Sequence, residues 1–163
     1  MKKGKTISAV FLFSLGRFMI FKSSFRKKSD GRFFKEEGYK VIMERSDSVL
    51  KQERLYLNSN LNMDTLAKRV GTNRSYLSKS IKIVKKTSYP KYINLIRVEY
   101  AKSLMATELG GCAKGIKSSA MSVDDYAVAS GFGSTKKFIR YFKEQEGVTP
   151  SRYISALVWK VRR

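Results

Sequence analysis

The feature that most constrains the fold is a pattern of helix signals that occurs twice, in residues 62–86 and again in residues 122–146. Each copy opens with a residue that can cap a helix, followed by an alanine and then by a glycine at the same spacing. The alanine lets two helices approach closely, and the glycine accepts the positive φ of a tight turn between them. The repeat therefore predicts two helix-turn-helix units in an all-α chain.

Each copy also carries its own capping residues and an inward-facing apolar stripe. In the first copy, Asn62 and Asn73 are the predicted caps, and the predicted inward residues are Met63, Leu66, Ala67, Val70, Tyr76, Leu77 and Ile81. In the second copy, Ser122 is the predicted cap with Asp125 completing it, and the inward residues are Val123, Tyr126, Ala127, Phe132, Phe138 and Phe142. The second helix of each copy is rich in Lys and Arg, which suits a groove lined with phosphates.

The rest of the chain divides by its glycines, prolines and apolar spacing. The predicted segments are a basic-flanked apolar helix (1–28), a linker (29–45), a supporting helix and first helix-turn-helix (46–86), a connecting helix (87–106), a glycine-bearing loop (107–121), and a second helix-turn-helix with a closing helix (122–158). Pro90 and Pro150 mark helix starts. The long loop is expected to loosen the second unit relative to the first.

The charge balance points to a polyanionic partner. The chain has 34 Lys and Arg against 13 Asp and Glu, a formal net charge of +21, which favours nucleic acid or an anionic membrane. It has one cysteine and no histidine, so disulfide frameworks, zinc clusters and histidine-dependent triads are excluded. No phosphate-binding loop or nucleophile motif is found either, so we expect no enzyme, no metal and no cofactor.

Residues 1–28 contain an apolar stretch, residues 7–21, between two basic segments. A helix needs about 20 residues to span a bilayer, so this stretch is too short, and Arg17 interrupts it. A signal peptide fits the basic start, but its small-residue cleavage site is missing. Two interpretations remain open: a helix that lies on an anionic membrane surface, or a helix that packs against the protein or a partner.

From Ser46 to Leu157 the chain resembles the DNA-binding domain of the AraC/XylS family of bacterial transcription regulators. The second unit carries the resemblance in Ala127, Gly131, Phe132, Phe138, Phe142, Lys143, Gly147, Thr149, Pro150 and Tyr153. The first unit and connecting helix carry it in Leu66, Ala67, Gly71, Tyr76, Leu77, Ser78, Tyr92, Arg97, Ala101 and Leu104. The loop 107–121 is longer than the tight connection usual in the family. The residues outside the resemblance show no sheet pattern, so we do not expect them to form the sensor domain that many relatives carry.

The resemblance implies a homeodomain-like fold in which the second helix of each unit enters the major groove. The positions it places against DNA bases are Ser75, Ser78, Lys79, Thr135, Lys136, Ile139 and Arg140. Lys79, Lys136 and Arg140 can donate to guanine, and Ile139 can touch a thymine methyl. For each of these residues the alternative is a phosphate contact or a solvated side chain. Arg74, Lys82 and Arg152 are expected to bind phosphates.

The function that follows is a sequence-specific transcription regulator that binds two adjacent major-groove segments of double-stranded DNA. Family resemblance adds RNA polymerase as a further candidate partner. The expected location is the cytoplasm, with or without a tether formed by residues 1–28 on the inner face of the cytoplasmic membrane. The alternatives are a membrane-associated basic interaction module, or an architectural DNA binder without base readout.

Overall fold

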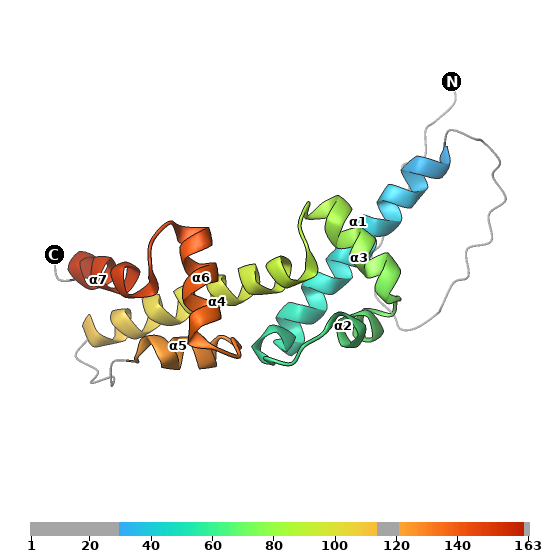
Figure 1. Cartoon of the computed structure of the whole chain (residues 1–163). Helices are drawn as coiled ribbons and strands as arrows, with labels where there is room; N and C mark the ends of the chain where they lie inside the picture. Colours follow the sequence, from blue (N-terminus) through green and yellow to red (C-terminus); the bar gives the residue numbers. More distant parts are fainter. Residues whose placement is uncertain (1–29, 114–120, 162–163) are drawn as a thin grey trace, which may run out of the picture.

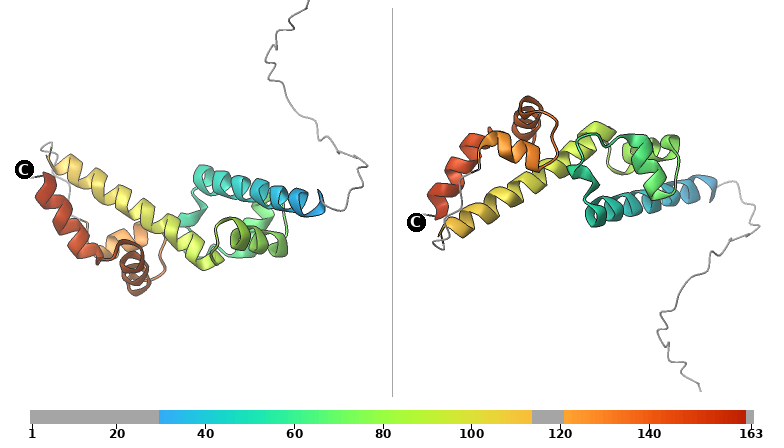
Figure 2. Two further views of the ribbon diagram at one scale, coloured as in Figure 1. Left: turned by 90° about the horizontal axis from the view of Figure 1, so that it is seen from above. Right: turned by 90° about the horizontal axis from the view of Figure 1, so that it is seen from below.

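The computed structural model describes residues 30–113 and 121–161, and within these ranges it contains helices and no strand. In chain order these are α1 (Asp30–Glu53), the 3-10 helix η1 (Leu55–Leu57), α2 (Met63–Val70), α3 (Arg74–Val84), α4 (Tyr89–Ala113), α5 (Val123–Ala129), α6 (Thr135–Glu146) and α7 (Pro150–Val161). The all-α prediction is confirmed. Helix α4 forms the axis of the molecule, with α1–α3 around one end and α5–α7 around the other (Figures 1 and 2).

The predicted helix caps are confirmed at three positions. The side chains of Asn62 and Asn73 accept hydrogen bonds from backbone N–H groups in the first turns of α2 and α3, each at 2.9 Å. Ser122 and Asp125 form a reciprocal capping box at the start of α5. The turn glycines Gly71 and Gly131 have φ values of 74° and 81°, which favour glycine over residues with a Cβ. Local sequence thus sets where these helices begin and end.

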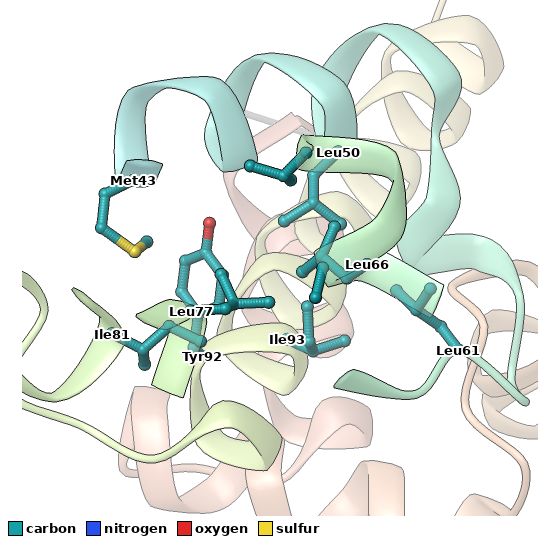
Figure 3. Close-up of a cluster of buried hydrophobic side chains, with 10 residues drawn as sticks. Met43, Leu50, Leu61, Leu66, Leu77, Ile81, Tyr92 and Ile93 are labelled. Atoms are coloured by element: carbon teal, nitrogen blue, oxygen red, sulfur yellow. The ribbon is translucent and has the colours of Figure 1, made fainter. Parts of the chain in front are cut away.

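The first hydrophobic core lies between α1, α2, α3 and the start of α4, as Figure 3 shows. Its fully or nearly buried members are Met43, Leu50, Leu61, Leu66, Ala67, Val70, Leu77, Ile81, Tyr92 and Ile93. Tyr92 also donates a hydrogen bond of 2.5 Å to Asp47 of α1. Burial and this hydrogen bond raise the pKa of Tyr92 well above its usual value, so the phenol is neutral. The core therefore includes one polar pair that ties α4 to α1.

The second hydrophobic core lies between α4, α5, α6 and α7. Its buried members are Val98, Ala101, Met105, Tyr126, Ala127, Phe132, Phe138 and Phe142. Phe142 makes edge-on ring contacts with Phe138 and with Tyr153 of α7, at centroid distances of 5.5 and 5.3 Å. Since α4 contributes residues to both cores, the two units share one helix as part of their interiors.

Residues 29–45, predicted as a linker with some helical tendency, are helical from Asp30 onward and belong to α1, which corrects the linker assignment. Tyr39, Met43 and Leu50 are at most 5% exposed and form one stripe of α1. A glycine inside a helix costs only about 1 kcal/mol, which burying several large side chains exceeds. Tertiary packing thus overrides the local signal of Gly38.

The loop predicted for residues 107–121 is also shorter than expected, because α4 continues to Ala113. One carboxylate oxygen of Glu108 accepts a hydrogen bond of 2.9 Å from the backbone N–H of Met121. The other accepts one from the hydroxyl of Tyr126 in α5. These contacts fasten the end of α4 to the start of the second unit. The looseness expected of the loop stays a prediction, since residues 114–120 lie outside the described ranges.

The apolar segment and its membrane interpretations, predicted for residues 1–28, lie outside the described residues. Among the helices that the structure does describe, none combines the length and the apolar character needed to cross a membrane.

Candidate nucleic-acid interface

Helix α3 exposes the polar face that the sequence predicted. Leu77, Ser80 and Ile81 are buried, and they fix which side of the helix faces the core. The side chains on the other side are all exposed: Ser75, Ser78, Lys79 and Lys82. Neither lysine takes part in a salt bridge with any described residue. This face combines short hydrogen-bonding groups with unpaired positive charge.

Tyr76 departs from its predicted inward position, because its side chain is 50% exposed. The buried positions of α3 leave it on the flank of the helix, beside Ser75 and toward α1. Its ring centre lies 6.4 Å from the ring centre of Tyr39, a buried residue of α1. Tyr76 is thus a further exposed group on the edge of this face. Its phenol carries both a donor and an acceptor, a capacity that the apolar pattern alone did not reveal.

Helix α6 presents the corresponding face of the second unit. Phe138 and Phe142 point inward and are fully buried. Lys136 and Arg140 are exposed one turn apart, and Ile139 between them is 37% exposed. The guanidinium of Arg140 lies 4.8 Å from the centre of the Tyr141 ring, a cation–π contact that restrains it.

Thr135, the first residue of α6, is only partly exposed. The preceding residue, Ser134, caps the helix through a hydrogen bond of 3.3 Å from the backbone N–H of Lys137. This cap was not predicted from the sequence. It places Thr135 at the start of the exposed face, at the positive end of the helix dipole.

The acidic residues of α6 are bound by α4. Glu144 accepts a hydrogen bond of 2.7 Å from Lys91, and Glu146 accepts one of 2.9 Å from Lys102. The hydrogen bond and charge of Lys91 lower the pKa of Glu144, so its carboxylate stays ionised. These pairs join α6 to its supporting helix. Lys136, Lys137, Arg140 and Lys143 remain without a salt bridge to any described residue.

The three residues predicted to bind phosphates differ in their surroundings. Arg74 is exposed but forms a salt bridge of 2.6 Å with Asp64 of α2. Arg152 is exposed in the first turn of α7. Lys82 lines a surface hollow with Lys86 and Ser88, at the start of α4. Lys86, Lys137 and Lys143 were not assigned from the sequence, although their charge was visible there.

No group of three or more potential metal ligands occurs within residues 30–113 and 121–161. The described surface therefore offers two basic helix faces, one on each unit, as its candidate binding site.

Comparison with known proteins gives a consistent family. A family model described as "Helix-turn-helix domain" matches residues 66–156, more than half of the chain. YtdP, an uncharacterized HTH-type transcriptional regulator of Bacillus subtilis (strain 168), is 31% identical over 108 residues, which are 66% of this chain and 13% of that protein. An HTH-type regulator from the cgkA 5' region of Pseudoalteromonas carrageenovora is 27% identical over 129 residues, 77% of this chain and 68% of that protein. The chain thus spans only a small part of YtdP.

Solved structures show the same fold. The DNA-binding domain of AdpA, in complex with a target DNA, has a TM-score of 0.55 and 22% identity, covering 75% of this chain and 95% of that one. ToxT from Vibrio cholerae has a TM-score of 0.56 and 28% identity, covering 71% of this chain and 37% of that one. Together with the matched family model and the two-unit architecture, these similarities show that the chain belongs to the AraC-type helix-turn-helix family.

Proposed function

We propose that the chain is a sequence-specific regulator of transcription that binds duplex DNA through α3 and α6. The observation that carries this proposal is that each unit turns one basic helix face to solvent, while the acids of α6 are held by α4. The major groove of DNA is wide enough to admit an α-helix. Lysines and arginines without a salt bridge attract phosphates. The proposed role is DNA binding without catalysis.

The residues divide by chemistry into base contacts and phosphate contacts. Lys79, Lys136 and Arg140 have the donors that guanine O6 and N7 accept, while Ser75, Ser78 and Thr135 can bond to either kind of base edge. Ile139 has only an apolar surface and suits a thymine methyl. Lys82 and Arg152 suit phosphates, and Arg74 joins them once it leaves Asp64.

Selection from a pool of random duplexes tests this proposal. The full chain is used to enrich bound duplexes over several rounds, and the enriched duplex is then titrated beside a scrambled duplex of equal composition. At about 150 mM salt a specific binder is expected to prefer its site by about 10³ or more. Equal affinity for both duplexes contradicts sequence-specific regulation and supports an architectural role. Binding to vesicles that contain phosphatidylglycerol, with no binding to DNA, supports the lipid-binding alternative.

The proposed function places the chain in the cytoplasm, where the chromosome is. Attachment of residues 1–28 to the inner membrane face stays a prediction, and separating membrane from soluble fractions of cells that express the full chain tests it. Contact with RNA polymerase is likewise a prediction from the family, to be tested by co-purification with and without target DNA.

A further inference from the structure

The 3-10 helix η1, which joins α1 to α2, touches α4 at Arg97. The Nε of Arg97 donates a hydrogen bond of 2.7 Å to the carbonyl of Tyr56, and its Nη2 donates one of 2.9 Å to the carbonyl of Asn58. Its Nη1 bonds to the side chain of Asn94 at 3.2 Å. Leu55, also in η1, packs against the first core. Arg97 thus fixes a piece of the first unit to the shared helix.

Arg97 is an unusual arginine because its side chain is bound to backbone carbonyls and not to an acid. It is 8% exposed, and it forms no salt bridge with a described residue. Burial lowers the pKa of its guanidinium. A buried charge is tolerated only where its donors are satisfied, and the planar fork of arginine satisfies several at once. Its burial also removes Arg97 from direct contact with DNA.

The turn of the second unit meets the same piece of η1. A Cβ added to Gly131 would lie 2.5 Å from the carbonyl oxygen of Tyr56 and 2.7 Å from both Cα and the carbonyl oxygen of Leu57. The next residue, Phe132, is buried, and its ring centre lies 5.7 Å from the guanidinium carbon of Arg97. The backbone of one unit is therefore in close contact with the backbone of the other.

This contact distinguishes the two turn glycines of the repeat. Gly71 has almost the same φ as Gly131, but a Cβ added there would meet nothing within 4 Å. The positive φ alone explains a glycine at residue 71. At residue 131 the close approach of η1 is a second, independent requirement for the absence of a side chain.

We infer that Arg97 and Gly131 are positioning residues that hold the two units at one fixed geometry, so that the chain selects DNA targets by the spacing of two half-sites. This inference rests on the proposed function. If α4 were the only connection, bending or twisting of this helix would change the orientation of one unit relative to the other. The contact of η1 with the second unit's turn adds a second attachment, and Arg97 joins both. Helices α3 and α6 are then held at one fixed distance from each other when they bind DNA.

A matched pair of glycine variants tests the spacing. The full chain, Gly131→Ala and Gly71→Ala are titrated with the enriched duplex, with duplexes that have one to five base pairs added between its half-sites, and with a single half-site. Both variants place an alanine at a positive φ, 74° at residue 71 and 81° at residue 131, but only Gly131→Ala obstructs η1. For Gly131→Ala, affinity for the original spacing is expected to fall about tenfold or more, while half-site affinity stays unchanged and the preference for spacing flattens. An equal loss in both variants at every spacing overturns the inference.

A distance measurement separates this inference from the proposed function, because it needs no DNA. Spin labels are placed at Ile83→Cys of α3 and Lys137→Cys of α6, in a chain with Cys112→Ser. Gly131→Ala is expected to broaden the distance distribution, and Gly71→Ala is not. If the chain shows no sequence preference for DNA but Gly131→Ala broadens the distance distribution, the contact between the units is supported. In that case only the proposed function is refuted. An unchanged distribution in folded Gly131→Ala overturns the inference.

Arg97→Lys is the second variant, in case Gly131→Ala fails to fold. It keeps the charge but loses the planar set of donors. The same broadening and the same flattened spacing preference are expected, with helix content unchanged by circular dichroism. Arg45→Lys, an exposed residue of α1, is its matched control. If Arg97→Lys keeps the narrow distribution and the spacing preference of the unaltered chain, Arg97 is not a positioning residue.

Discussion

Arg74 Nη1 donates a hydrogen bond of 2.6 Å to Oδ2 of Asp64, so the first residue of α3 is bound to the first turn of α2. Both side chains are more than half exposed. An exposed ion pair contributes at most about 1 kcal/mol to stability, so a phosphate can compete for this arginine. Asp64 therefore restrains a residue that otherwise suits the DNA backbone.

Replacing Asp64 with asparagine is expected to strengthen DNA binding, because Arg74 becomes free to contact a phosphate. The gain should be similar for specific and scrambled duplexes, and the dependence of log affinity on log salt should steepen by about 0.9. Fluorescence anisotropy over a salt series measures both. The matched control is Asp124→Asn, at the equivalent position of α5, where no described salt bridge exists. An equal gain in the control would show that only net charge matters.

Lys79→Ala and Arg140→Ala are each expected to relax specificity at one base pair. A lost bidentate contact to guanine costs about 1–3 kcal/mol and removes the preference at that position only. Binding of the variants to duplexes with single base-pair changes in the enriched site measures the effect. Lys51→Ala removes the same charge from α1 as a control. A uniform loss across all duplexes would assign Lys79 and Arg140 to phosphates instead.

Lys82→Ala and Arg152→Ala are expected to weaken binding to every duplex by a similar factor, because phosphates carry no sequence information. Each should lower the slope of log affinity against log salt by about 0.9. The salt series used for Asp64→Asn measures this slope as well. A change in sequence preference, with the slope unaltered, would contradict the assignment.

The capping box of α5 gives a prediction on stability and pH. Losing a serine cap costs about 0.5–2 kcal/mol, so Ser122→Ala should lower the free energy of unfolding in urea at pH 7. Hydrogen bonds from Ser122 hold the pKa of Asp125 below its usual value of 3.8. A lowered folded-state pKa stabilises the fold above pH 3.8, and this stabilisation is lost as the pH falls through the folded-state value.

The difference between the unaltered chain and Ser122→Ala should therefore shrink when the unfolding experiment is repeated at pH 3 or below. Asp125→Asn, which cannot ionise, should show less of this pH dependence than the unaltered chain. An effect of Ser122→Ala that is equal at both pH values would show that the carboxylate plays no part.

The parts of the fold that sequence predicted are those set by neighbours in the chain. Asn62 and Ser122 each cap a helix through bonds to residues three positions away, and Gly71 is explained by its own φ. The sequence also predicted which faces of α3 and α6 are exposed, because burial of Leu77 and Phe138 determines which side of each helix faces the core. Signals of this kind are contained within one turn of helix.

The parts that were missed depend on segments far apart in the chain. Helix α1 is stabilised by Met43, which packs in the first core, and by Tyr39, whose ring contacts Tyr76 of α3; no local pattern in the sequence shows these partners. The pairing of Arg74 with Asp64 requires the fold of α2 against α3. The close approach of Gly131 to η1 joins residues of different units.

The sharing of α4 between both cores has a consequence for how such proteins diverge. Between Ile93 of the first core and Val98 of the second, the helix is unbroken. One residue inserted there would rotate the second unit by about 100° and move it by about 1.5 Å relative to the first, which would break the contact of Gly131 with η1. The number of residues in this short stretch thus determines the relative orientation and separation of the two units. An insertion there would require a rebuilt contact at Gly131, because even a whole helical turn moves the second unit by about 5.4 Å.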